Sequence, residues 1–88
     1  GKYPRDVLEN KFKQELLSIC AGLLRETGFG GKLRGKLYSV MLNHIRTKIF
    51  SGKTLCDVDD DDIEFAMVLM PEIRKNFSKS IVAGIVST

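Results

Sequence analysis

The sequence predicts an all-α fold, a compact single-domain bundle of four to five helices. Three observations support this prediction. The chain has 88 residues, the size of one small domain. Apolar residues make up 43% of it, which is enough for a modest core and argues against intrinsic disorder. Through most of the chain, apolar side chains recur every three or four residues, the period of an amphipathic helix.

Residues 5–26 are predicted to form the first helix. Pro4 stands just outside its start, and Asp6 lies in the first turn, where the helix dipole favours acids. Gly28 suits a left-handed C-terminal cap, so the helix should stop there. The apolar stripe of this helix consists of Leu8, Phe12, Leu16, Ile19 and Leu23.

A second helix is predicted over residues 32–50, followed by a turn at Ser51-Gly52. His44, the single histidine, falls near the apolar side of this helix, which predicts a buried or half-buried structural role. Tyr38 and Phe50 lie off that side and are expected to be partly exposed. The apolar side itself consists of Leu33, Leu37, Val40, Met41 and Ile45.

The remaining two helices are predicted over residues 59–70 and 71–86. The segment from Ile63 to Met70 is apolar almost all round, which is typical of a buried helix at the centre of a bundle. Pro71 should end this helix or begin the next one, because proline interrupts a helix interior. The last helix carries an apolar stripe of Ile73, Phe77, Ile81 and Ile85.

Charge divides the chain into a basic and an acidic half. Residues 1–53 carry eleven Lys/Arg and four Asp/Glu, a net charge of +7. Residues 54–88 carry three Lys/Arg and seven Asp/Glu, a net charge of −4. This distribution gives a small domain two electrostatically different surfaces for partners.

The basic half is expected to show a polar, mostly basic face on helix 32–50. Such a face can neutralise phosphates, although a solvated surface of an ordinary helix has the same pattern. The predicted basic binding face consists of Lys32, Lys36, Asn43, Arg46, Lys48 and Lys53.

The aspartate run of the acidic half favours N-capping of the third helix and interaction with its dipole. The run has more carboxylates than a cap requires, so the surplus predicts an acidic docking edge for a basic partner. This edge consists of Asp57, Asp59, Asp60, Asp61 and Asp62, and the aromatic residues expected to add exposed contacts elsewhere are Phe29, Tyr38 and Phe50.

Familiar catalytic and ligand motifs are absent. An EF-hand loop that started at Asp57 would need glycine at its sixth position and glutamate at its twelfth. The chain has Asp62 and Val68 at these positions. Gly52-Lys53-Thr54 lacks the earlier glycine of a phosphate-binding loop, because position 47 is Thr. We therefore expect no enzyme activity, no catalytic or metal-binding residues, no cofactor and no small-molecule substrate.

The two cysteines, Cys20 and Cys56, are too few and too far apart to predict a disulfide scaffold, although a bond between them stays open. Cys20 lies in an apolar helical stretch and is expected to be a buried, reduced side chain. The chain has no signal stretch and no membrane-spanning run, so an intracellular location, cytoplasmic or nuclear, is expected. It is also expected to be a domain excised from a larger protein.

Residues 51–85 resemble the second half of a sterile alpha motif domain. The resemblance lies in Ser51-Gly52-Lys53-Thr54-Leu55, the acidic helix start that leads to Ile63, and the later run from Arg74 to Ile81. The first half of the chain differs, because it has two long helices and lacks the early tryptophan of that family. The resemblance implies head-to-tail self-association or binding to another such domain, and less often to RNA.

These observations predict a non-enzymatic protein–protein interaction module. Its partner would be another protein or a second copy of the chain, joined through the opposed basic and acidic patches. The alternative is a nucleic-acid-binding domain that uses the basic face of helix 32–50. No interaction with a membrane is expected.

Overall fold

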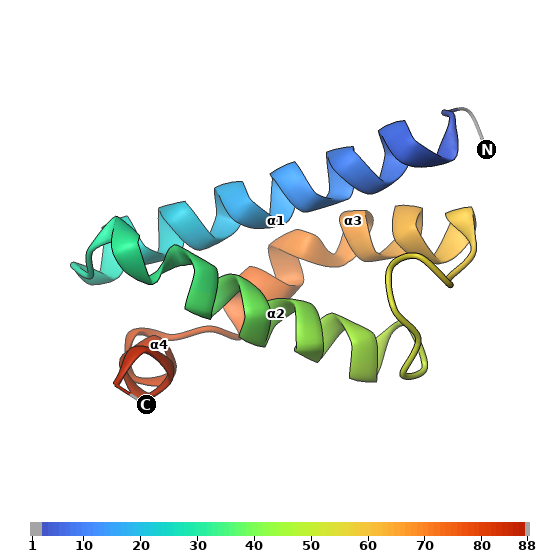
Figure 1. Cartoon of the computed structure of the whole chain (residues 1–88). Coiled ribbons are helices and arrows are strands. Elements are labelled where there is room, and N and C mark those ends of the chain that lie inside the picture. The colour runs from blue at the N-terminus through green and yellow to red at the C-terminus, as the bar shows by residue number, and fades with distance from the viewer. Residues whose placement is uncertain (1–2, 88) are drawn as a thin grey trace.

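The computed structural model describes residues 3–87, which form four α-helices, one short 3-10 helix and no strand (Figure 1). The predicted all-α compact bundle is therefore confirmed. None of the described helices is long and apolar enough to cross a bilayer. In chain order the elements are α1 (Arg5–Thr27), η1 (Gly31–Leu33), α2 (Arg34–Lys48), α3 (Asp60–Lys75) and α4 (Lys79–Val86).

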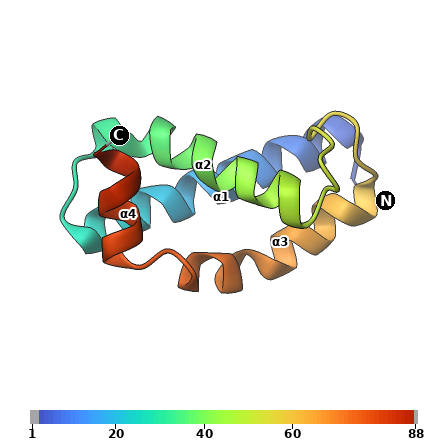
Figure 2. The same ribbon diagram turned by 90° about the horizontal axis from the view of Figure 1, so that it is seen from below.

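Helix α1 is the longest element and spans most of the molecule, whose principal extents are 38 × 21 × 19 Å. It packs against α2, α3 and α4. Helices α2 and α3 lie below α1 in Figure 1. The view from below shows that they are close together at the end where a loop joins them and diverge toward the other end (Figure 2). Helix α4 crosses the open end, between the start of α2 and the end of α3. Every other helix therefore shares the buried side of α1.

The core is a single cluster to which all four α-helices and the loop between α2 and α3 contribute. At about 25 cal/mol per Å² of apolar surface removed from water, burial of such side chains is the main stabilising term. The core members that α1 supplies are Leu8, Phe12, Leu16, Cys20, Leu23 and Leu24. The rest of the chain supplies Leu37, Met41, Ile45, Phe50, Leu55, Val58, Ile63, Ala66, Met70, Ile73, Phe77 and Val82.

The end of α1 has the left-handed cap that the sequence predicts. Gly28 has φ 84°, a conformation that costs a residue without a Cβ very little. Its N–H donates to the carbonyl of Arg25 at 3.3 Å, and the N–H of Phe29 donates to the carbonyl of Leu24 at 2.9 Å. This pair of hydrogen bonds is a Schellman motif, which satisfies two terminal carbonyls and turns the chain back toward the core.

The predicted boundary at Pro71 is wrong, because α3 continues through this proline to Lys75. Proline costs an interior helix one hydrogen bond, but Met70 and Ile73 lie on either side of it and are both buried in the core. Their burial favours continuing the same helical face. Pro71 itself is exposed, so its ring is directed away from the packed side.

The last two helices are separated at Asn76–Ser78 instead, so the predicted helix over 71–86 is shortened to α4. The N–H groups of Asn76 and Phe77 donate to carbonyls three residues earlier, which forms a turn. The side chain of Ser78 then accepts a hydrogen bond from the N–H of Ile81 at 3.4 Å and caps α4. Phe77, between the two helices, is buried and pins the turn to the core.

Phe50 was expected to be an exposed aromatic contact, and this prediction is wrong. Helix α2 ends at Lys48, and Ser51 and Gly52 then adopt positive φ values of 52° and 84°. Phe50 lies just before this reversal, and its N–H still donates to the carbonyl of Ile45 at 3.1 Å. Its side chain is 1% exposed, and its ring centroid lies 5.8 Å from that of Phe12. Phe50 therefore belongs to the core of the bundle.

The prediction that residues 63–70 form a fully buried central helix is also wrong. Phe65 is 55% exposed and Val68 is 74% exposed, although Ile63, Ala66 and Met70 of the same helix are buried. The central position belongs to α1, and α3 has one buried and one exposed face.

Replacement of Phe50 by alanine should lower the free energy of unfolding by about 3–5 kcal/mol, because it removes a buried ring and leaves a cavity. The matched control is Phe65→Ala, which shortens an exposed ring and should cost less than about 1 kcal/mol. Urea denaturation followed by circular dichroism measures both. Equal losses for the two variants would contradict the burial of Phe50.

Candidate functional site

The predicted basic binding face lies along α2 and both of its flanks. Lys32 belongs to η1, and Lys53 lies in the loop that follows α2. Arg46 is the half-buried member of the set. Its Nη2 donates to the carbonyl of Gly52 at 3.2 Å, which links α2 to the turn that follows it. Val40, which is 39% exposed, adds an apolar side chain to this side of α2. The exposed members of the predicted set are Lys32, Lys36, Asn43, Lys48 and Lys53.

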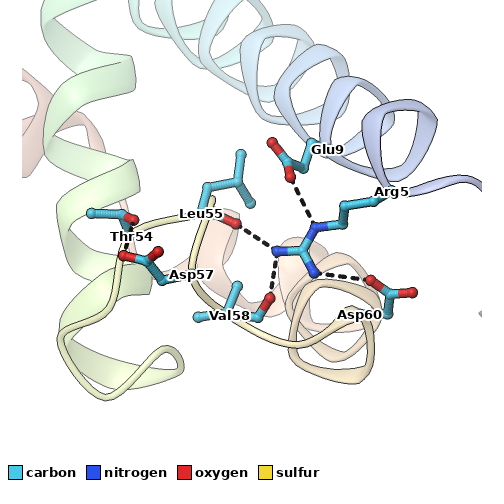
Figure 3. A network of polar contacts seen from close by, with 7 residues as sticks. All are labelled: Arg5, Glu9, Thr54, Leu55, Asp57, Val58 and Asp60. Atoms are coloured by element: carbon cyan, nitrogen blue, oxygen red, sulfur yellow. Dashed lines mark hydrogen bonds and ion pairs between the residues drawn. The ribbon is translucent and has the colours of Figure 1, made fainter.

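Part of the predicted acidic edge is used inside the fold, where Arg5 connects the start of α1 to the start of α3 (Figure 3). Its Nη1 donates to Asp60 Oδ1 at 2.9 Å, and its Nε donates to Glu9 Oε2 at 2.9 Å. Its Nη2 donates to the carbonyl of Leu55 at 2.8 Å and also to the carbonyl of Val58. One guanidinium therefore joins α1, the loop and α3.

This arrangement suits a guanidinium, whose planar fork donates in several directions at once. Partial burial opposes the charge of Arg5, but hydrogen bonds and charge interactions with Glu9 and Asp60 outweigh it and raise the pKa of Arg5. The same guanidinium also donates to two loop carbonyls, those of Leu55 and Val58. Arg5 thus fixes where the acidic half of the chain sits against the basic half.

The other aspartates have separate roles. Asp57 accepts a hydrogen bond from Thr54 Oγ1 at 2.9 Å within the loop. Asp59 occupies the N-cap position of α3, but its side chain makes no capping hydrogen bond, so the expected cap is absent. Asp60, Asp61 and Asp62 fill the first turn of α3, where the helix dipole favours negative charge. Asp61 remains exposed.

The outer side of α3 carries a stripe that sequence reasoning missed. Asp61, Phe65, Val68 and Glu72 are all exposed and are spaced by four, three and four residues, so they follow one side of the helix. We call these four residues the α3 stripe. Two apolar side chains lie in its middle and one carboxylate at each end. The signal was present in the sequence, because the buried residues Ile63, Ala66, Met70 and Ile73 occupy the opposite side.

The remaining aromatic candidates, Phe29 and Tyr38, are half-buried and pack against the core. Burial, and then the neighbouring Cys20, raises the pKa of the Tyr38 hydroxyl. Both rings therefore give only part of their surface to solvent. The more exposed aromatic side chains are Phe65 and Tyr3, of which Tyr3 is 45% exposed.

The titratable residues outside these faces show no catalytic grouping within residues 3–87. The His44 ring meets the Phe77 ring edge-on at 5.8 Å between centroids, in half-buried surroundings. No group of three His, Cys, Asp or Glu residues in the described chain is placed to hold a metal ion.

The two cysteines are both free and differ in environment, with Cys20 buried and Cys56 exposed. Cys20 Sγ lies 3.5 Å from Met41 Sδ, within the interface of α1 and α2. Burial raises the pKa of the Cys20 thiol to about 11, which the positive charge of Arg34 opposes. Cys20 is therefore a packing residue in its protonated form.

Replacement of Arg5 by glutamine should lower the urea midpoint several times more than Arg74→Gln does, because Arg5 serves four partners. Arg74 is the matched control, since it too makes an ion pair between helices, with Glu26, but that pair is exposed. Arg5→Lys should restore only part of the loss, because an ammonium cannot reach all four acceptors. Equal midpoints for the Arg5 and Arg74 variants would show that the Arg5 network contributes no more than an exposed ion pair.

Thiol-reactive reagents at mildly alkaline pH should modify Cys56 rapidly and Cys20 only after unfolding. Burial keeps the reagent away from Cys20, and a pKa of about 11 keeps its thiol protonated at that pH. The unfolded thiol, with an ordinary pKa of 9.0, loses its proton first as the pH rises. Stability should therefore fall between about pH 9 and about pH 11. The variant Cys56→Ala should show the same fall. Mass spectrometry that finds Cys20 modified in the folded chain would contradict the assignment.

Comparison of this chain with protein-family models, curated proteins and solved structures finds no match in any of the three. The resemblance of residues 51–85 to sterile alpha motif domains gains no support from these comparisons, and the surfaces described above stand on their geometry alone.

Proposed function

We propose that this chain is a non-enzymatic protein-interaction module that associates with a second copy of itself, through the α3 stripe of one copy and the basic side of α2 of the next. The observation that carries the proposal is the exposure of Phe65 and Val68, at 55% and 74%, between two carboxylates on one side of α3. Exposed apolar neighbours with a polar rim are typical of interaction surfaces.

The outer side of α2 has the complementary pattern. Lys36, Val40 and Asn43 are exposed and are spaced by four and three residues, and Lys32 lies four residues before Lys36. Val40 thus offers an apolar side chain to a partner, and two lysines precede it on the same side of the helix. We call Lys32, Lys36, Val40 and Asn43 the α2 stripe. The α3 stripe has a carboxylate at each end and the α2 stripe has two lysines beside its valine, so the two stripes suit each other in charge.

The apolar side chains of the two stripes are not covered within a single copy. Phe65, Val68 and Val40 are all exposed to solvent in the monomer, so their apolar surface is available to another molecule. One internal ion pair of the acidic run joins Asp60 to Arg5, and neither residue belongs to a stripe.

The two stripes are different surfaces, so the contact between copies is heterologous. Each copy that binds through one stripe leaves its other stripe open, which permits a growing chain of copies unless the rotation closes a ring. The contact is small and partly electrostatic. It should therefore be weak and weaken further as salt screens the charges.

Two variants that each remove one stripe test this proposal. Phe65→Lys with Val68→Lys removes the α3 stripe, and Lys32→Glu with Val40→Glu removes the α2 stripe. Each variant alone should be monomeric by sedimentation velocity at concentrations at which the original chain associates. An equimolar mixture of the two should form a heterodimer that does not grow, because it contains one intact pair of stripes.

The matched control is Val7→Glu with Lys13→Glu, which makes the same kinds of change at exposed positions of α1. It should associate as the original chain does. A monomeric original chain at high concentration and low salt would overturn the proposal, and so would a mixture that stays monomeric.

The basic residues also leave nucleic-acid binding as a second candidate, since Lys48 and Lys53 continue the exposed positive charge beyond the α2 stripe. The same variants separate the two functions. If nucleic-acid phosphates are the partner, binding to a labelled oligonucleotide should survive removal of the α3 stripe. Self-association, in contrast, should be lost when this stripe is removed.

A further inference from the structure

A pocket of about 370 Å³ lies at the corner where α1 ends and η1 and α2 begin, at the left end of Figure 1. It is open to solvent on one side. Its volume is at the lower end of the range of about 300–1,000 Å³ that ligand pockets occupy. Neither the α2 stripe nor the α3 stripe contributes to it, because its lining consists of Ala21, Leu24, Arg25, Phe29, Gly31 and Arg34.

The pocket combines an apolar floor with two cationic side chains. Leu24 is 1% exposed, and Phe29 is packed against the core, so these residues form a fixed apolar surface. Arg25 and Arg34 are exposed, and neither guanidinium makes an ion pair or a side-chain hydrogen bond with another residue of the described chain. They differ in this from Arg5 and Arg74, whose guanidinium groups both have carboxylate partners.

Two backbone carbonyls at the pocket already have hydrogen-bond donors. The carbonyls of Leu24 and Arg25 accept the hydrogen bonds of the helix cap, from Phe29 and Gly28. Beyond Gly31, its two chain neighbours and the backbone of its own helical turn, no atom lies within 4 Å of the position that a Cβ on Gly31 would take. A ligand therefore needs to provide an apolar group for the floor and an acceptor for the arginines.

We infer that this pocket binds an organic carboxylate, that is, one carboxylate group attached to a compact apolar group. The guanidinium fork matches a carboxylate geometrically and donates two hydrogen bonds to it. A carboxylate carries a single charge and is cheaper to move next to an apolar floor than a doubly charged phosphate. The ligand is either a free aromatic or aliphatic acid or the C-terminal carboxylate of a peptide that ends in an apolar residue.

Amide NMR titrations with phenylacetate and with its neutral analogue phenylacetamide test the inference. Phenylacetate should cause saturable shifts at the amides of Leu24, Phe29 and Gly31, and phenylacetamide should bind about tenfold or more weakly, because it leaves the arginines without an anion. A short peptide with a C-terminal phenylalanine, as the free acid and as the amide, forms the second arm. The arm whose acid form binds more tightly identifies the source of the carboxylate.

Two pairs of variants locate the binding. Arg25→Gln with Arg34→Gln should weaken phenylacetate binding about tenfold or more, whereas Lys13→Gln with Lys79→Gln, which changes the net charge equally, should not. Gly31→Leu places a side chain in the pocket and should abolish binding. Gly30→Leu is its control, since Gly30 has equally open surroundings but does not line the pocket.

Three results would overturn the inference. They are equal binding of the acid and the amide in both arms, the absence of saturable shifts at the pocket amides with every probe, and binding that both pocket variants leave unchanged. Circular dichroism of each variant confirms that it is folded. The outcome is independent of self-association, because no substitution in this experiment touches either stripe.

Discussion

The buried side of α1 is the constraint on which the rest of this fold depends. Its apolar residues recur along all 23 residues of the helix. Helices α2, α3 and α4 all pack against α1. The divergence of α2 and α3 beneath α1, and the placement of α4 across their open end, follow from the need to cover that stripe. The outward sides of α2 and α3 are left over from this packing, and they are the surfaces that carry the charged stripes.

Local patterns in the sequence are sufficient for the elements whose signals lie within a few residues. The apolar period of α1 and the glycine at its end predict both its length and its left-handed cap. Pro71 misleads, because proline propensity is a local signal, whereas the helix continues on account of Met70 and Ile73, which are buried by contacts with distant residues. Phe50 misleads for the same reason, since it is buried by contact with Phe12, which is distant in the sequence.

The candidate surfaces are predictable in outline and less so in detail. The basic and acidic halves follow from counting charges, but the sequence alone does not indicate that Arg5, at the far end of the basic half, binds Asp60 and two loop carbonyls. Three of the four partners of Arg5 lie fifty or more positions from it in the chain, and the fourth, Glu9, lies four positions away. The exposure of Phe65 and Val68 was within reach, because a helical wheel for the whole of α3 separates them from its buried residues. It was missed because the segment from Ile63 to Met70 is apolar almost all round, a pattern that favours a fully buried helix.

The central position of α1 has a consequence for how the molecule comes apart. A bundle in which two separate helix pairs each enclose an interior can lose one pair and keep the other, but here α2 and α3 each depend on the same partner. Detachment of α1 would open the whole interior to water at once, and Arg5 would carry the loop's anchorage away with it. The chain is therefore built as a single cooperative unit, in which subglobal opening is confined to the short terminal helix and the exposed turns.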